Sequence, residues 1–313
     1  MFCGAKGLGT GAIRHVFSHH AFIPAKEPLE ANVWGVHRSS GGYSTLFKER
    51  LLRARQRAEA PVERRFTGKK AEKVPIVGER LAGRPVERFR ELAGGSTMLL
   101  LNQSSEQLDQ VPDGSVDWVV TDPPYADNVM YSELSDYFYV WLRQALKDDY
   151  PSFGRSHVDD TREAVHNSGR GRDGDFYTEV LGNVFAEVGR KLKLGGRLVF
   201  TFHHSGEEAW LSVEDALVRA RLVVERWWPV HAEMTSGVPI QNKRESGGHL
   251  DIVLVCARVG EISKPAGQPS VEEMGRRLAE AVRLAAADHR ALLKAGALQA
   301  ATWERTHARD EAA

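Results

Sequence analysis

Short apolar runs recur along the chain, and each has the length and composition of a strand. Many of their residues are β-branched or aromatic, and turn-forming residues bound them, which is typical of buried strands. The predicted strands cover 98–102, 116–120, 197–202, 222–230 and 251–257. A loop rather than a helix joins the last two, which favours an antiparallel pair at the end of the sheet.

Between these runs, apolar residues recur at helical spacing. The first such set predicts an amphipathic helix that packs on the sheet, with most of its aromatic side chains in the core. Its members are Leu134, Tyr137, Phe138, Trp141 and Leu142. The apolar stripe from Phe176 to Leu192 predicts a second helix, which Asp175 can cap, and a third is expected over 207–220. Strands that alternate with helices predict an α/β domain.

The most informative stretch follows the strand at 116–120, where the chain reads Asp122-Pro123-Pro124-Tyr125. Two prolines, each with a restricted φ and no amide hydrogen, end the strand and stiffen the turn. In a doubly wound sheet, ligands bind at the carboxyl ends of central strands. We therefore expect this strand to be central and buried, with Asp122 and Tyr125 projecting from its end. The alternative is a strand-ending turn without further meaning.

These residue types suit a planar exocyclic amine. The Asp122 carboxylate and the Pro123 carbonyl can accept hydrogen bonds from an NH2 group and so direct its lone pair toward an incoming methyl group. The Tyr125 ring can stack on the base. A base reaches such a site only by leaving the duplex, which costs a few kcal/mol, and one aromatic stack offsets about 1–3 kcal/mol of that cost. The stretch predicts a pocket for a flipped nucleobase.

Asp122-Pro123-Pro124-Tyr125 resembles the catalytic tetrapeptide of the DNA amino-methyltransferases, which methylate adenine N6 or cytosine N4 with S-adenosyl-L-methionine. The longer span 121–143 resembles one family of adenine-specific DNA methylases, whose larger members carry an N-terminal domain of unknown function and sometimes a zinc ribbon. The resemblance implies an α/β, Rossmann-like class I methyltransferase fold with a mixed sheet and an antiparallel last strand. It also implies methyl transfer to N6 of adenine in DNA, with these four residues as the catalytic set.

Other functions stay open at this point. The same geometry suits cytosine N4 or an amine in RNA. A catalytically silent nucleic-acid-binding subunit is an alternative of a different class. The chain has no Pro-Cys pair, which argues against methylation at carbon 5 of cytosine.

Further candidate site residues follow from position. His203 and His204 come after a predicted parallel strand and are expected at the same rim, where they would contact substrate or cofactor, or else make structural hydrogen bonds. Asn128 is a further candidate substrate contact. In the resembled methylases, an acidic residue after an earlier strand often approaches the adenine of the cofactor. Serines stand at that place here, so Ser104 and Ser105 are the candidate cofactor contacts.

A complete cofactor half is not recognisable in the sequence. The glycine-rich stretch Gly7–Gly11 resembles a cofactor loop, but only six residues precede it, too few for the strand that such a loop follows. Neither the region before Thr97 nor the tail after Arg258 offers a convincing acidic residue for the cofactor ribose. We expect the cofactor half to be absent or incomplete, and an upstream segment or a partner subunit to supply the loop.

The charge of the chain is informative about partners only in one segment. The 313 residues carry 42 Lys and Arg against 42 Asp and Glu, yet the segment 48–90 holds 14 basic and 6 acidic residues. Such a segment is attracted to a phosphate backbone, or is simply a solvated helix and linker. Two cysteines fit a reducing cytoplasm, and no apolar run approaches the length of a membrane span.

The chain is expected to have three parts: a loop-rich, basic region over 1–95, a methyltransferase domain over 96–260 and a helical tail over 261–313. His15, His19 and His20 share a helical face, but no carboxylate or cysteine completes a metal site. The arginine-bearing loop 154–174 is polar and rich in glycine, which favours disorder over a nucleic-acid-tracking role.

Overall fold

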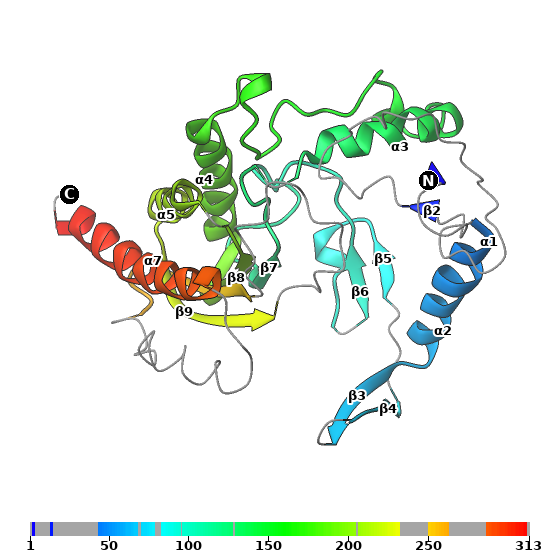
Figure 1. The fold of residues 1–313 in the computed structure, drawn as a ribbon, viewed down its shortest axis with the longest axis horizontal. Coiled ribbons are helices and arrows are strands. Elements are labelled where there is room, and N and C mark those ends of the chain that lie inside the picture. The colour runs from blue at the N-terminus through cyan, green and yellow to red at the C-terminus, as the bar shows by residue number, and fades with distance from the viewer. Residues whose placement is uncertain are drawn as a thin grey trace. The chain divides into compact units, whose positions relative to one another are not determined.

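The computed structural model of the chain divides into two compact units, Met1–Asn102 and Gln103–Ala313, which we treat separately (Figure 1). The structure describes residues 2–3, 13–14, 43–67, 70–78, 83–94, 96–127, 129–204, 206–231, 250–262 and 286–311. The glycine-rich stretch 7–11, the three histidines at 15, 19 and 20, and Asn128 lie outside these residues.

The first unit contains a helix and several short strand pairs. The helical part comprises α1 (Tyr43–Leu46), the π-helical η2 (Phe47–Leu52) and α2 (Arg53–Glu59). The strand pairs are β1 (Phe2–Cys3) with β2 (Ile13–Arg14), β3 (Val62–Thr67) with β4 (Lys70–Pro75), and β5 (Arg84–Val86) with β6 (Thr97–Leu99). A 3-10 turn, η3 (Phe89–Glu91), separates β5 from β6. The strand predicted at 98–102 is therefore present, shorter and shifted by one residue.

The second unit is built on one mixed sheet with strand order β7-β8-β10-β9. These strands are β7 (Val116–Thr121), β8 (Leu192–Phe202), β9 (Leu222–His231) and β10 (Leu250–Arg258). β7 pairs with β8 in parallel, and β10 runs antiparallel to both β8 and β9. The predicted mixed α/β architecture and the antiparallel final pair are thereby confirmed.

The position of β7 differs from the prediction of a central, buried strand. β7 is an edge strand of its sheet, with β8 as its one neighbour among the described residues. Two of its large apolar side chains face outward, Trp118 at 62% and Val120 at 75% exposure. Apolar content predicted the strand correctly, but it does not reveal how many strands flank it.

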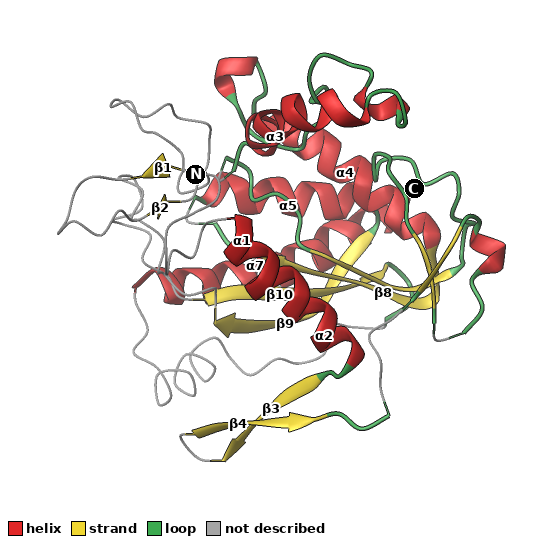
Figure 2. Ribbon diagram, turned by 90° about the vertical axis from the view of Figure 1, so that its right-hand side faces the viewer, coloured by secondary structure: helices red, strands yellow, loops and turns green. Residues whose placement is uncertain are grey.

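Helices on one side of the sheet form the core. α4 (Gly174–Lys191) and α5 (Glu207–Arg219) lie over the strands, and Figure 2 shows both on the same side of β8 and β10. α7 (Ala286–Glu311) adds buried residues such as Leu292 and Leu298 to the same core. The N-cap of α4 is Asp173 rather than the predicted Asp175, because the Asp173 carboxylate accepts from the Phe176 amide at 2.9 Å.

α3 (Tyr131–Leu146) forms where the apolar spacing predicts a helix, but its aromatic face is not core. Trp141 is 69% exposed, and Phe138 and Leu142 are exposed too. The helix is held instead by the loop that follows it. The Tyr139 ring stacks on Phe153 of η4 (Pro151–Phe153) with ring centroids 5.3 Å apart. The periodicity predicted the helix correctly, but the prediction that its aromatic side chains lie in the core was wrong.

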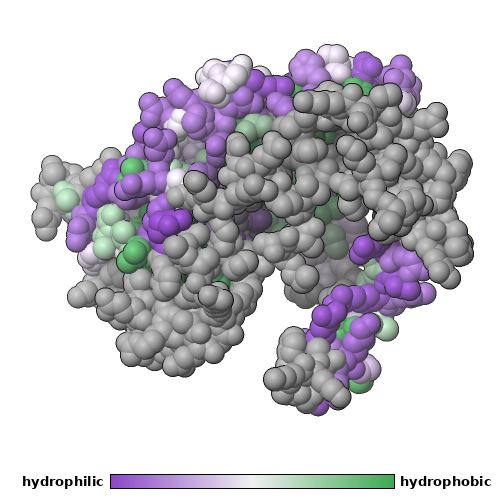
Figure 3. All heavy atoms as spheres, viewed as in Figure 1, coloured by the Kyte–Doolittle hydropathy of each residue, from purple (hydrophilic) through white to green (hydrophobic). Residues whose placement is uncertain are grey.

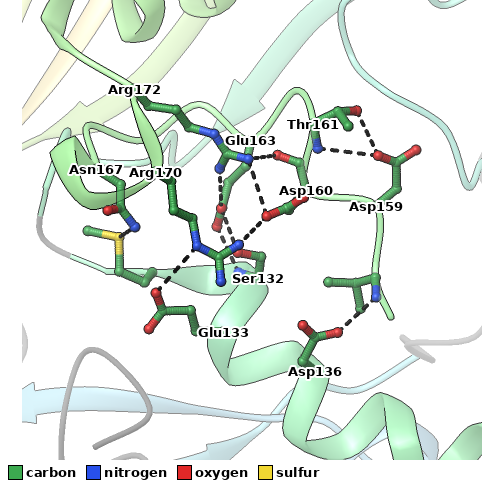
Figure 4. A network of polar contacts seen from close by, with 12 residues as sticks. Ser132, Glu133, Asp136, Asp159, Asp160, Thr161, Glu163, Asn167, Arg170 and Arg172 are labelled. Carbon is green, nitrogen blue, oxygen red and sulfur yellow. Dashed lines mark hydrogen bonds and ion pairs between the residues drawn. The ribbon is translucent and has the colours of Figure 1, made fainter. Parts of the chain in front are cut away.

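The loop 154–174 is tied together by ion pairs, so the prediction of disorder is wrong. Figure 4 shows Arg170 and Arg172 reaching the carboxylates of Asp160 and Glu163 across the turn η5 (Ser168–Arg170). Arg155 pairs with Asp159, and Arg162 with Glu106. All four arginines of the loop are thus engaged within the second unit.

Among the described helices, none is long and apolar enough to cross a membrane.

Candidate active site

Three side chains meet where β7 and β8 end side by side. Asp122 follows the last residue of β7 and is exposed, whereas Tyr125 and Thr201 are half-buried. The Tyr125 hydroxyl lies 2.6 Å from Oδ1 of Asp122 and 3.0 Å from Oγ1 of Thr201. The Thr201 hydroxyl also donates to Oδ1 of Asp122. Two hydroxyl groups therefore converge on one carboxylate oxygen.

The phenol of Tyr125 stays neutral at physiological pH. Its burial raises the pKa of the hydroxyl, and the hydrogen bond to Asp122 raises that pKa further. The Tyr125 ring packs edge-on against Phe202, with centroids 5.3 Å apart and planes at 67°. The ring is thus anchored on one side by a core aromatic and on the other by the carboxylate.

The turn that contains the two prolines is tied to α4 through a hydrogen bond to Pro124. Pro123 is buried, and the Pro124 carbonyl accepts a hydrogen bond from the Tyr177 hydroxyl of α4 at 2.8 Å. Burial raises the pKa of Tyr177, so it remains a donor. Ala126 then adopts φ 51° in a buried position, a left-handed conformation that is costly for a residue with a Cβ. The turn is therefore rigid on both sides of Tyr125.

The two predicted histidines lie at the end of β8 with different partners. Nδ1 of His203 donates to the Leu250 carbonyl at 2.8 Å, which ties it to β10. Nδ1 of His204 accepts from the Gly206 amide at 2.9 Å, so its other nitrogen, Nε2, carries the hydrogen. Nε2 donates in turn to Oδ1 of Asp127 at 2.9 Å. The Asp127 carboxylate is 61% exposed, so the histidine orients a second acidic group near the tetrapeptide.

The predicted cofactor contacts Ser104 and Ser105 lie in an exposed turn. The Ser104 hydroxyl accepts from the Glu106 amide at 3.2 Å. Glu106 accepts from Arg162 at 2.6 and 3.0 Å and from Asn183 at 3.0 Å. The hydrogen bond from Arg162 is the main reason why the pKa of Glu106 is lowered. The polar contacts of this turn lead to Arg162 and α4 rather than to Asp122.

Sequence reasoning missed Thr201, Asp127 and Tyr131. Thr201 carried a usable signal, since it is the one polar residue in the run Leu198–Phe202 and stands near the end of the strand. Tyr131 begins α3 and is 46% exposed; burial raises its pKa, and the charges of Asp122 and Glu163 add to the rise. Its phenol therefore shares the electrostatic environment of the Asp122 carboxylate.

Within the described ranges, no group of three or more His, Cys, Asp or Glu side chains could hold a metal ion. In the turn that carries Ser104 and Ser105, Glu106 is the residue that pairs with Arg162.

Fold and site together define an α/β domain whose acidic and aromatic side chains meet at the carboxyl ends of two parallel strands. No family model and no curated protein matches the chain. Among solved structures, a candidate DNA modification methylase from Thermus thermophilus aligns at 18% identity with a TM-score of 0.26. The alignment spans 55% of this chain and 56% of the other. A likeness this weak defines neither a fold nor a function.

Proposed function

We propose that this site binds the N6 amine of adenine in DNA and presents it for methylation, in a Rossmann-like class I methyltransferase that uses S-adenosyl-L-methionine. One observation carries the proposal. Oδ1 of Asp122 lies within hydrogen-bond distance of two hydroxyl groups, whereas none of the described residues donates to Oδ2, and the side chain is exposed. A carboxylate with one tethered and one free oxygen suits an incoming N–H group.

Each residue has its own role in the proposed reaction. Oδ2 of Asp122 accepts from the exocyclic NH2 group and directs the nitrogen lone pair away from the carboxylate. The Pro123 carbonyl accepts the second N–H, and the Tyr125 ring supports the base. Bound S-adenosylmethionine would supply an electrophilic methyl group, whose bond to sulfur would break as the bond to nitrogen forms, with a neutral thioether as the leaving group. When the nitrogen forms its new bond to carbon it loses one proton, which Oδ2 of Asp122 accepts and passes to water.

DNA as the partner is supported by charge rather than by a reading motif. The basic residues Arg50, Arg64, Arg65 and Lys73 on η2, β3 and β4 are exposed, and Figure 3 shows a hydrophilic surface over α2 and β3. Arg64 and Lys73 lie directly opposite each other in the hairpin. Like charges in that position repel unless an anion lies between them, as a phosphate would. Localisation in the cytoplasm accords with this proposal.

The test is methyl transfer to DNA followed by digestion to nucleosides. The full chain is incubated with isotopically labelled S-adenosylmethionine and unmethylated genomic DNA, and the nucleosides are separated by mass. We expect the label in N6-methyldeoxyadenosine. Label in N4-methyldeoxycytidine, or in RNA supplied in parallel, would replace adenine in DNA as the substrate while keeping the amine chemistry.

A second candidate is a catalytically silent nucleic-acid-binding subunit. It is favoured by the sequence, in which no glycine-rich cofactor loop follows a recognisable strand. Titration of the chain with S-adenosylmethionine separates the two, because a silent subunit binds DNA without saturable binding of the donor. An upstream segment or a partner subunit that restores donor binding would return the chain to the first proposal.

A further inference from the structure

Thr201 occupies a position that neither the tetrapeptide nor the histidines explain. Its hydroxyl lies on β8, a strand with neighbours on both sides, and touches both Asp122 and Tyr125. We infer that Thr201 is a positioning residue, which holds the Asp122 carboxylate so that Oδ2 faces the target amine. The inference rests on the proposed function and extends it to a residue outside the tetrapeptide.

The number of hydroxyl hydrogens explains why the two oxygens of the Asp122 carboxylate differ. The three contacts among Asp122, Tyr125 and Thr201 share only two hydroxyl hydrogens, and the ionised carboxylate has none to give. Both hydroxyls donate to Oδ1, or Tyr125 donates to Thr201 and Thr201 to Oδ1, or Thr201 donates to Tyr125 and Tyr125 to Oδ1. Oδ1 receives at least one of the two hydrogens in each pattern. Oδ2 is therefore the oxygen left for substrate, whichever pattern holds.

The pairing of β8 fixes the position of the Thr201 hydroxyl. Val253 of β10 lies opposite Thr201 on one side, and the parallel register of β7 pairs Thr121 with Phe200 on the other. Phe200 and Phe202 are fully buried beneath the helices, so the alternation of side chains holds Thr201 on the other face of the sheet. A hydroxyl on a strand paired on both edges moves less than one on a loop.

Without this hydroxyl, the carboxylate loses its link to the sheet. The terminal torsion of an aspartate is broad and two-fold, so rotation readily exchanges Oδ1 and Oδ2. Tyr125 would then be the one remaining hydroxyl contact of Asp122 within the described part of the chain. Its donor comes from the same short turn as the carboxylate, and Tyr125 is then connected to β8 by the packing of its ring on Phe202 rather than by a hydrogen bond. The amine would still bind, but a smaller fraction of complexes would have the lone pair aligned.

The experiment compares Thr201→Val, Thr201→Ser and Thr121→Val by initial methyl-transfer rates of the full chain on DNA. Thr201→Val keeps the β-branched shape and removes the hydroxyl, and we expect kcat to fall about 10- to 100-fold through misalignment of the amine. KM for DNA should stay within about twofold, because the hydroxyl does not touch substrate. Thr201→Ser keeps the donor and should restore most of the rate. Thr121→Val, on the neighbouring strand, should match the wild type.

The outcomes are separable. A wild-type kcat in Thr201→Val, or the same loss in Thr201→Ser, overturns the role of Thr201 and leaves the proposed function intact. A wild-type chain without any transfer overturns both. Melting temperatures identify a folding defect, and Thr201→Ala then provides a smaller side chain that cannot clash with the carboxylate. A rise in KM that accounts for the whole loss would show substrate binding instead of positioning, and would also overturn the inference.

Discussion

The carboxylate of Asp122 has two unlike oxygens, and the difference comes from its neighbours. Oδ1 contacts hydroxyls from a turn and from a strand, while Oδ2 receives no hydrogen bond from the described residues. Tyr125 contacts the carboxylate through its hydroxyl, and in the proposed function its ring supports the base. The raised pKa of its phenol, caused by burial and by Asp122, means that the donor stays protonated at neutral pH.

The two roles of Tyr125 can be separated by substitution. Tyr125→Phe keeps the ring against Phe202 but removes the donor, and we expect the transfer rate to fall about tenfold, the equivalent of one hydrogen bond. Tyr125→Ala also removes the stacking surface, worth about 1–3 kcal/mol, so the loss should be at least about a further fivefold. Initial rates measure both. Equal rates for the two variants would show that the ring does not support the base. Tyr150→Phe, an exposed tyrosine on the loop after α3, is the matched control.

Only some residues of the candidate site could be predicted from the sequence. Asp122 and Tyr125 could be found because two prolines after an apolar run mark the end of a strand. Thr201 carries a local signal, but its partner and that of Asp127 could not be assigned, because the bonded groups lie 79 and 77 residues apart along the chain. Such pairs depend on strand order and register, which local pattern does not contain.

α3 shows how a polar network can hold a helix that the core does not cover. The Glu163 carboxylate accepts from both the amide and the hydroxyl of Ser132 at 2.7 Å, and Arg172 donates to it at 3.0 Å (Figure 4). Ser132 lies in the first turn of α3, where amide groups lack partners within the helix. A carboxylate from a distant loop thus supplies the cap that the sequence before the helix does not.

Removal of this carboxylate should loosen α3. Glu163 is 12% exposed and Arg172 is 10% exposed, so Glu163→Ala leaves a nearly buried guanidinium with one partner fewer. We expect the free energy of unfolding to fall by about 2–3 kcal/mol. Glu133→Ala provides the control in the same network, because Glu133 is 3.8 Å from the more exposed Arg170 and should contribute less than about 1 kcal/mol. Denaturant unfolding measures both, and equal losses would contradict the capping role.

The helix itself was predictable from its spacing, and its surroundings were not. Leu134 to Leu142 predicts an apolar face, but an apolar face indicates burial only if some element covers it. Polar loop sequence was equally ambiguous. Arginines and acidic residues in 154–174 are compatible with disorder or with ion pairing, and only the folded geometry separates the two.

Over the whole molecule, charge and secondary structure are distributed unevenly along the chain. The neutral total hides a segment, 48–90, with 14 basic and 6 acidic residues, while the sheet and its helices lie in Gln103–Ala313. Among the described strands, the sheet of that second unit ends at β7, whose exposed Trp118 and Val120 were predicted to be buried. The α/β class and the antiparallel end of the sheet follow from the order of apolar runs. The number of strands beside β7 does not.

The proposed function depends on the Asp122 carboxylate accepting a hydrogen bond from the target amine. The decisive measurement is the initial rate of methyl transfer to DNA by Asp122→Ala, beside the wild type and Asp117→Ala, an exposed aspartate on β7 that pairs with Lys193. We expect Asp122→Ala to lose at least about 10²-fold in rate, since removal of one aligned acceptor from a transition state has that effect, with an unchanged melting temperature. Asp117→Ala should transfer as the wild type does. Transfer by Asp122→Ala within about twofold of the wild-type rate would contradict the account.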